Sequence, residues 1–173
     1  IPYAKFYAYT KKIATLLLNA AKKDFKLKST TLILGTVFGP GDNSDHFIPS
    51  IIRKMNKKSS KLEILGSGKE SRDFIFVEDQ VKAICLHKDC NDEILNIGTG
   101  HLIKIEKIIN NVKKIMNFKG KIIFKKMKKK DGDIKRGMSV KKATLISGWP
   151  IKYKLTNIDK ALELTIHDMR ING

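Results

Sequence analysis

The chain has 173 residues, enough for one compact domain with a hydrophobic core or for part of a larger one. Hydrophobic residues make up 42% and charged residues 30%, which excludes a disordered chain, and no apolar run approaches the ~20 residues of a membrane helix. The net charge is +18, but its cations are almost all lysine, so we expect a solvated surface rather than a nucleic-acid partner.

The first half of the chain is predicted to alternate between helices and strands. Apolar residues at helical spacing predict a helix over 5–23, and a β-branched run ending in a Gly-Pro-Gly turn predicts a strand over 29–39. A helix is predicted over 47–55, followed by short strands over 61–65 and 72–77 that flank the turn GSGKES.

The second half continues this alternation. The predicted elements are a helix over 77–88, a strand over 93–100 that runs into a glycine loop, a helix over 103–116, a strand over 121–124, a helix near 140–147 and a final helix over 157–169. Such alternation indicates an α/β fold. Cys85 and Cys90 fit neither a disulfide framework nor a zinc site, so we expect no metal, a cytoplasmic protein, and Cys85 in the core.

Tyr7 and Lys11 are the first candidates for chemistry. Residues four apart lie on one face of a helix, so the phenol and the ammonium are expected to point the same way. An ammonium beside a phenol favours the phenolate and makes tyrosine a usable general acid or base at neutral pH. The alternative is coincidence, because lysine is so frequent here that a Tyr-x-x-x-Lys pair arises readily by chance.

The order of the later motifs gives the pair its context. The segment YAYTK on the first helix is followed by TVFGPGDN, HFIP, ILGSGKESRDFIFVEDQVKAI, LNIGTG, DGDIKR and SGWP. This succession resembles the C-terminal half of the extended short-chain dehydrogenase/reductases that act on nucleotide sugars, the NAD-dependent epimerase/dehydratase family. The segments HFIP, NFKGKIIF and DGDIKR are most similar to the GDP-L-fucose synthase branch.

The resemblance implies a fold and a domain division. The expected fold is α/β, the C-terminal part of a Rossmann-like parallel sheet plus a smaller α/β substrate-binding domain. Residues 1–42 would be a remnant of the NAD(P)-binding domain, and 43–173 mainly the nucleotide-sugar-binding domain, with 77–100 returning to the Rossmann sheet. The glycine-rich pyrophosphate turn and the usual catalytic serine or threonine are absent, so we expect a missing N-terminal Rossmann half and, as in relatives, a homodimer.

The resemblance also assigns catalytic and cofactor roles. Tyr7 would exchange a proton with the sugar, and Lys11 would hold the nicotinamide ribose and tune Tyr7. His46, in HFIP, would act as an acid in epimerisation; the alternative is a solvated loop histidine or a helix cap. The cofactor would be NADP or NAD, contacted by Tyr7, Lys11, Thr36 and Val37.

Substrate binding is implied for a further set of residues. The candidates are Asn43, His46, Arg72 and Lys135, with Arg136 as an alternative to Lys135. Arg72 would grip the substrate diphosphate, because the planar fork of arginine suits phosphate oxygens. The alternative for Arg72 is a surface ion pair with Asp73 or Glu70.

Several functions remain open at this level. Thr36 stands where many relatives carry asparagine and Leu65 where the fucose synthases carry an aromatic residue, and the loop before HFIP is short. A UDP-sugar 4-epimerase or a dTDP- or CDP-sugar dehydratase of the same family is therefore the first alternative. The others are an inactive remnant and a lysine-rich nucleic-acid-binding module.

Overall fold

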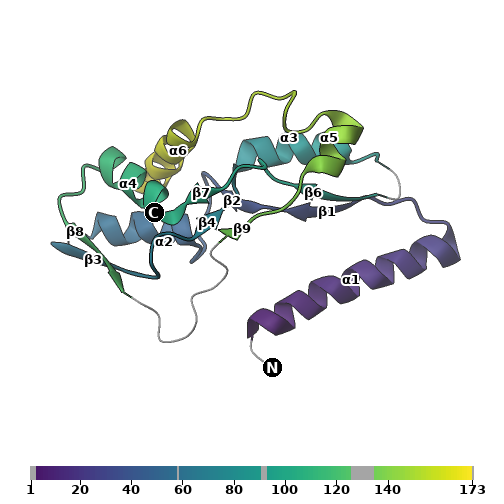
Figure 1. Cartoon of the computed structure of the whole chain (residues 1–173), viewed down its shortest axis with the longest axis horizontal. Helices are drawn as coiled ribbons and strands as arrows, with labels where there is room; N and C mark the ends of the chain where they lie inside the picture. Colours follow the sequence, from purple (N-terminus) through teal and green to yellow (C-terminus); the bar gives the residue numbers. More distant parts are fainter. Residues whose placement is uncertain (1–2, 58, 91–92, 126–134, 173) are drawn as a thin grey trace.

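The computed structural model describes residues 3–57, 59–90, 93–125 and 135–172, and it has an α/β fold (Figure 1). In chain order the elements are α1 (Tyr3–Phe25), β1 (Thr31–Leu34), β2 (Thr36–Phe38), α2 (Phe47–Asn56), β3 (Lys61–Leu65), β4 (Ser71–Arg72), β5 (Phe74–Phe76), α3 (Val77–His87), β6 (Ile94–Ile97), β7 (Ile103–Lys104), α4 (Ile105–Ile115), β8 (Lys121–Lys125), β9 (Lys135–Arg136), α5 (Lys141–Ser147) and α6 (Ile158–Ile171).

The strand predicted over 29–39 is divided at Gly35, where it changes partner. Strand β1 pairs in parallel with β6, and β2 pairs in parallel with β5. The change is made by successive amides: the Gly35 N–H donates to Ile97 O at 2.8 Å and the Thr36 N–H to Asp73 O at 3.2 Å. These parallel pairings, with helices between the strands, confirm the predicted α/β class.

A third parallel pair is formed by β3 and β8. Strands β3 and β8 pair over five residues, and in β3 the side chains alternate between buried (Leu62, Ile64) and exposed (Lys61, Glu63). This alternation is the period of a strand with one covered face. The cover comes from α2, α4 and α6, which pack on one another and enclose a core.

The buried residues form two clusters. The larger cluster joins the apolar faces of α2, α4 and α6 to β3 and to the three buried phenylalanines of β2 and β5. The smaller cluster consists of residues from β5, β6, α3 and α5 together with Trp149. The described residues therefore form two separate hydrophobic cores.

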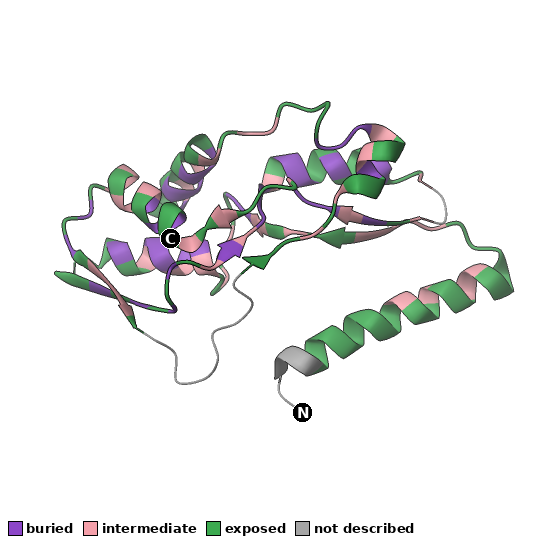
Figure 2. Cartoon of the chain, viewed as in Figure 1, coloured by how far each residue is buried: buried purple, intermediate pink, exposed green. Residues whose placement is uncertain are grey.

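Helix α1 contrasts with both cores, because it extends away from them and is exposed along almost its whole length (Figure 2). Large apolar side chains are exposed on it: Phe6, Tyr7, Tyr9, Ile13, Leu16, Leu17 and Phe25. Ile33 and Leu34 of β1, the strand that follows, are 48% and 41% exposed. This is far more exposed apolar surface than one helix of a globular domain usually carries.

Two predictions about local structure are wrong. Residues 103–104 form strand β7 rather than the start of the helix, because they pair with β4. Cys85 is exposed rather than in the core, because Ala83 and His87, four residues apart, form the buried side of α3. In the described parts of the chain, no helix combines the length and apolarity needed to cross a bilayer.

Candidate active site

Tyr7 and Lys11 share one side of α1. The Lys11 ammonium nitrogen lies 5.3 Å from the centroid of the Tyr7 ring, within cation–π range. Tyr7 is 56% exposed, so its phenol is accessible rather than locked in a core. One turn of α1 thus supplies an accessible phenol with a cation beside it, as the Tyr-x-x-x-Lys spacing predicts.

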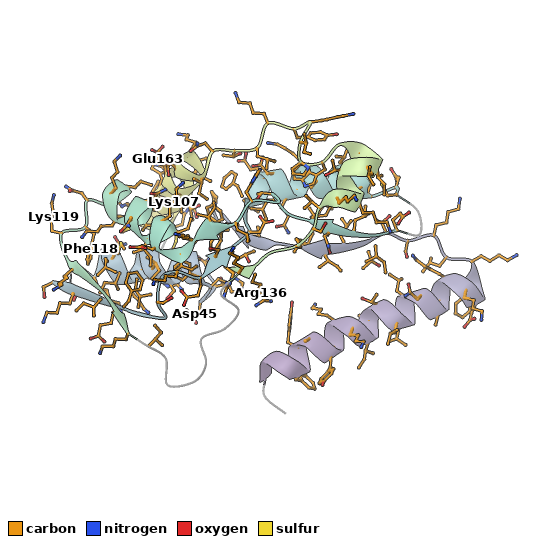
Figure 3. All side chains as sticks on the ribbon, viewed as in Figure 1. Asp45, Lys107, Phe118, Lys119, Arg136 and Glu163 are labelled. Atoms are coloured by element: carbon orange, nitrogen blue, oxygen red, sulfur yellow. The ribbon has the colours of Figure 1, made fainter. Side chains whose placement is uncertain are left out.

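A cavity of about 600 Å³ lies between α1 and β1, and Tyr7 and Lys11 both line it. Its other walls come from Ala14, Thr15 and Leu18 of α1, from the four residues of β1, and from Arg136. In Figure 3 Arg136 lies just above the amino-terminal end of α1. A residue 125 positions after Lys11 thereby places a guanidinium at the same cavity.

Arg136 lines this cavity, and Arg72 lies next to Arg136 without lining the cavity itself. The two residues are Cα partners on the adjacent parallel strands β4 and β9, and β4 also pairs with β7. Arg72 is partly buried, and its Nη1 donates to Ser71 O at 2.8 Å. Two arginines in register on neighbouring strands are a basis for recognising an anion with several oxygens.

Asp73 and Glu70 were the ion-pair partners considered for Arg72. Their carboxylates accept hydrogen bonds from other residues. The Asp73 carboxylate is buried and accepts from the N–H groups of Thr99 and Gly100, each at 3.0 Å. Glu70 Oε1 accepts from the Ser67 N–H at 3.0 Å and its hydroxyl at 2.9 Å. Burial alone would raise the pKa of Glu70, but these bonds outweigh it and lower that pKa below 4.5.

The loop after β2 carries Asn43 and His46, both exposed. The loop is held at its start by the Gly41 N–H, which donates to Asp168 Oδ2 at 2.7 Å. At its end, Arg53 Nη2 donates to the Asp45 carboxylate at 2.9 Å. His46 occupies the N-cap position of α2, but its side chain makes no capping hydrogen bond, so the helix-cap alternative is not supported.

The predicted site residues therefore separate into groups. The structure brings Tyr7, Lys11 and Arg136 to one cavity, with Arg72 beside Arg136. Thr36, Val37, Asn43, His46 and Lys135 do not line that cavity. Lys135 is the Cα partner of Ser71 on β9, and residues 131–134 of the DGDIKR segment lie outside the described residues.

Sequence reasoning did not single out Asp168. This residue of α6 accepts the hydrogen bond from Gly41 in the loop after β2. Its only sequence signal is an acid in an amphipathic helix, which is ordinary. Arg136 was considered only as an alternative to Lys135; the stronger signal in its favour was that it is one of four arginines among 35 basic residues. Where the structure describes the chain, no three His, Cys, Asp or Glu side chains converge as metal ligands would.

Comparison with known protein families gives a match to part of the chain. The model of the NAD dependent epimerase/dehydratase family matches residues 2–98, which is more than half of the 173 residues. The match includes Tyr7, Lys11, the loop after β2 and Arg72. The chain belongs to the NAD dependent epimerase/dehydratase family.

Two individual relatives are GDP-L-fucose synthases. The chain is 32% identical over 149 residues to GDP-L-fucose synthase of Dictyostelium discoideum, covering 80% of this chain and 46% of that protein. It is 31% identical over 164 residues to GDP-L-fucose synthase of Sinorhizobium fredii, covering 89% and 52%. The chain thus spans about half the length of these relatives.

The chain also matches about half the length of solved structures. The fold matches UDP-glucose 4-epimerase of Thermotoga maritima, solved with UDP-glucose, with a TM-score of 0.83 and 25% identity, over 95% of this chain and 53% of that one. Thermus thermophilus UDP-glucose 4-epimerase, solved with NAD, matches with a TM-score of 0.79 at 20% identity. The second likeness concerns the fold alone.

Proposed function

We propose that this chain is the C-terminal half of an NAD(P)-dependent nucleotide-sugar epimerase and reductase of the GDP-L-fucose synthase type. The observation that carries the proposal is the position of Tyr7 and Lys11 on one side of α1, at a cavity that Arg136 also lines. The two GDP-L-fucose synthases that match 80% and 89% of the chain support the GDP-L-fucose branch.

Tyr7 is the proton donor and acceptor in this proposal. Its accessible phenol exchanges a proton with the sugar oxygen at carbon 4 as the oxidation state of that carbon changes. Lys11, 5.3 Å from the ring centroid, stabilises the phenolate that forms and can hold the nicotinamide ribose through its ammonium hydrogens. NAD(P), when bound, supplies or accepts the hydride.

The residues present fit only one end of such a cofactor. Tyr7 and Lys11 suit the nicotinamide ribose, and Thr36 and Val37 on β2 are proposed to border the ring. The sequence has no Gly-x-Gly-x-x-Gly turn to cradle a pyrophosphate at a helix N-terminus. We therefore assign the pyrophosphate and the adenosine to a dinucleotide-binding half of about this chain's length, since the chain covers 46% and 52% of the two GDP-L-fucose synthases.

Arg72 and Arg136 are assigned to the diphosphate of the substrate. Their register on β4 and β9 sets two guanidinium groups on neighbouring strands, and Arg136 already faces the cavity of Tyr7. Asn43, His46 and Lys135 are assigned to the sugar and the nucleotide of the substrate. His46 is the proposed acid for epimerisation, since its side chain has no structural bond as a helix cap and imidazole suits proton transfer near neutral pH.

The exposed side of α1 is assigned to protein contacts. In a protein that includes the dinucleotide-binding half, one face of α1 and the exposed residues of β1 would be covered by that half. The remaining apolar residues of α1 support a homodimer through this helix. Such a protein needs no membrane, and we expect it in the cytoplasm, where nucleotide sugars are made.

A UDP-sugar 4-epimerase is the second candidate. A putative UDP-glucose 4-epimerase of Methanocaldococcus jannaschii is 34% identical over 103 residues, although this covers only 59% of the chain. The match to the Thermotoga maritima structure also favours it. The two candidates differ in His46, which epimerisation at carbons 3 and 5 requires and epimerisation at carbon 4 does not.

The test is an assay of the protein that joins this chain to a dinucleotide-binding half. Purified protein is given NADPH and GDP-4-keto-6-deoxymannose, and separately NAD and UDP-glucose, and the products are separated. The proposal predicts NADPH consumption with the first substrate, lost in His46→Asn. Interconversion of UDP-sugars with no need for His46 would favour the second candidate, and no turnover with either class would contradict both.

A further inference from the structure

A second cavity lies at the carboxyl ends of three helices. Helices α2, α4 and α6 end around it at Asn56, Ile115 and Ile171, and the segments entering β3 and β8 complete its walls. Its volume is about 520 Å³, within the range of small-molecule sites. It shares no lining residue with the cavity of Tyr7 and Lys11, so the proposed reaction gives it no role.

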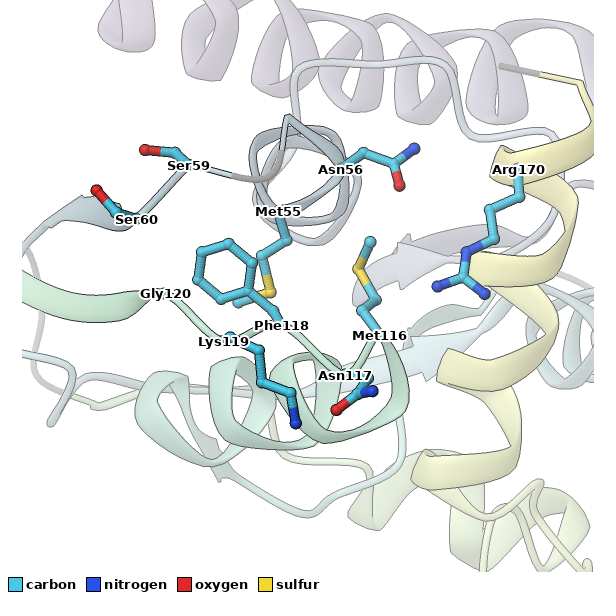
Figure 4. Close-up of a pocket in the computed structure, with 10 residues that line it drawn as sticks. All are labelled: Met55, Asn56, Ser59, Ser60, Met116, Asn117, Phe118, Lys119, Gly120 and Arg170. Atoms are coloured by element: carbon cyan, nitrogen blue, oxygen red, sulfur yellow. The ribbon is translucent and has the colours of Figure 1, made fainter.

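The floor of this cavity is apolar. Met55 and Phe118 are 2% and 8% exposed, and Met116 is part-buried beside them (Figure 4). The Phe118 ring is fixed from behind, because a Cβ at Gly120 would lie 2.3 Å from the ring and 2.6 Å from Ser59 O. An aromatic ring beside two adaptable thioethers forms a surface that accepts a flat apolar group.

The charged residues of the wall are all cations. Lys119 and Arg170 line the cavity, no carboxylate does, and within the residues that the structure describes neither cation forms an ion pair. In Figure 4 the Arg170 side chain extends from α6 toward Met116, and the Asn56 amide lies on the same side. Arg170 in the last turn of α6 also complements the helix dipole. Complementing the helix dipole explains a cation at this position, but it does not explain the apolar residues that line the cavity beside Arg170.

We propose that this cavity binds a small amphipathic anion, with a flat apolar or aromatic body that carries one carboxylate or phosphate group. The body would lie on Met55, Met116 and Phe118. Its anionic group would meet Arg170, and the amide of Asn56 beside it would supply a neutral hydrogen bond, while Lys119 and Asn117 line another part of the wall. The inference is independent of the proposed reaction, because the two sites have separate walls.

Methionine methyl groups provide a local readout of this binding. Purified protein labelled with ¹³C at its methionine methyls is titrated with phenylacetate, phenyl phosphate and the uncharged phenylacetamide. We expect saturable shifts of Met55 and Met116 with the two anions, while Met138, packed near Gly98, stays unchanged. Phenylacetamide should bind at least tenfold more weakly, and the tighter of the two anions identifies carboxylate or phosphate as the preferred group.

Substitutions on α6 separate specific binding from general affinity for the lysine-rich surface. Arg170→Gln should weaken anion binding about tenfold, the usual effect of losing one charge-assisted hydrogen bond. Lys160→Gln on the same helix removes the same charge away from the cavity and should leave the affinity unchanged. The proposal is overturned if Met55 and Met116 do not shift, if phenylacetamide binds as well as phenylacetate, or if both variants have the same affinity.

Discussion

The Asp168 carboxylate accepts a hydrogen bond from the Gly41 N–H at 2.7 Å, between residues 127 positions apart. This bond fastens the loop that carries Asn43 and His46 to the terminal helix α6. Asn172 Nδ2 donates to the other carboxylate oxygen at 2.8 Å. The Gly41 bond first, and then the Asn172 bond, hold the pKa of Asp168 below its ordinary value of 3.8.

The first prediction concerns the stability of this contact in acid. Because the folded pKa of Asp168 lies below the unfolded value, the contact stabilises the fold above about pH 4 and loses that contribution as the pH falls through the folded value. Asp168→Asn should therefore lower the free energy of unfolding at pH 7, and the difference from wild type should shrink below pH 4. Denaturant unfolding at pH 7, 5, 4 and 3 measures it.

Glu163→Gln is the matched control for Asp168→Asn, since it removes one negative charge from the same helix without touching the loop. A difference between wild type and Asp168→Asn that stays constant from pH 7 to pH 3 would contradict the assignment. Equal behaviour of the two variants would do so as well.

The second prediction concerns close packing at the start of the same loop. A Cβ at Gly39 would lie 2.3 Å from Cγ1 of Val77, so Gly39→Ala should destabilise the fold by about 1–3 kcal/mol, as overpacking does. At Gly41 a Cβ meets nothing within 4 Å, and φ is +80°. Gly41→Ala should therefore cost only the roughly 1–2 kcal/mol of a left-handed backbone.

Thermal melts of Val77→Ala and of the double variant Gly39→Ala/Val77→Ala distinguish packing from strain. Removing the Val77 methyls makes room for the new Cβ, so Gly39→Ala should cost less in the Val77→Ala background than in wild type. No such recovery would show that the main-chain conformation, rather than Val77, requires glycine at position 39.

The third prediction tests the two arginines. Arg136→Gln and Arg72→Gln should each weaken binding of the nucleotide diphosphate about tenfold in the protein that joins both halves, because each removes a charge-assisted bond to phosphate. Lys104→Gln lies on the other neighbour of β4, removes the same charge, and should have little effect. Titration calorimetry with GDP and with UDP measures this, and equal losses in all three variants would indicate a purely general electrostatic effect.

The fourth prediction concerns the 173-residue chain by itself. Helix α1 exposes Leu16 at 58% and Leu17 at 66%, and β1 exposes Ile33 and Leu34. We expect the chain to self-associate and to bind NADP(H) too weakly to measure, because the apolar surface is uncovered and no pyrophosphate turn is present. Sedimentation velocity should show oligomers that decrease in Leu16→Lys/Leu17→Lys; a monodisperse monomer that melts cooperatively, or tight NADP(H) binding, would contradict this.

The sequence predicted those elements whose signal is local. The strand at 61–65 and the helices at α1, α2 and α6 have apolar residues at a clear period, and their ends agree with the structure to within about two residues. The two-residue strands β7 and β9 were not predicted, since they exist only through pairing with β4. Such pairings depend on residues far apart in the chain, which periodicity does not report.

The residues of the candidate site also differ in whether a local sequence signal predicts their position. The Tyr7–Lys11 geometry follows from the period of one helix, so spacing was enough to predict it. The position of Arg136 at their cavity and the contact of Asp168 with Gly41 both depend on tertiary structure, which no local pattern reports. Cys85 was misplaced because its apolar neighbours suggested a core, whereas the phase of α3 turns it outward.

The most direct test of the central claim is turnover in two matched variants of the protein that joins both halves. Tyr7→Phe removes the hydroxyl proposed to move the proton, and Tyr9→Phe removes a hydroxyl from another exposed tyrosine of the same helix. With a general acid–base role, kcat should fall about 10²–10⁴-fold in Tyr7→Phe, with cofactor affinity nearly unchanged, while Tyr9→Phe stays close to wild type. Turnover that is the same in Tyr7→Phe and Tyr9→Phe would contradict the account.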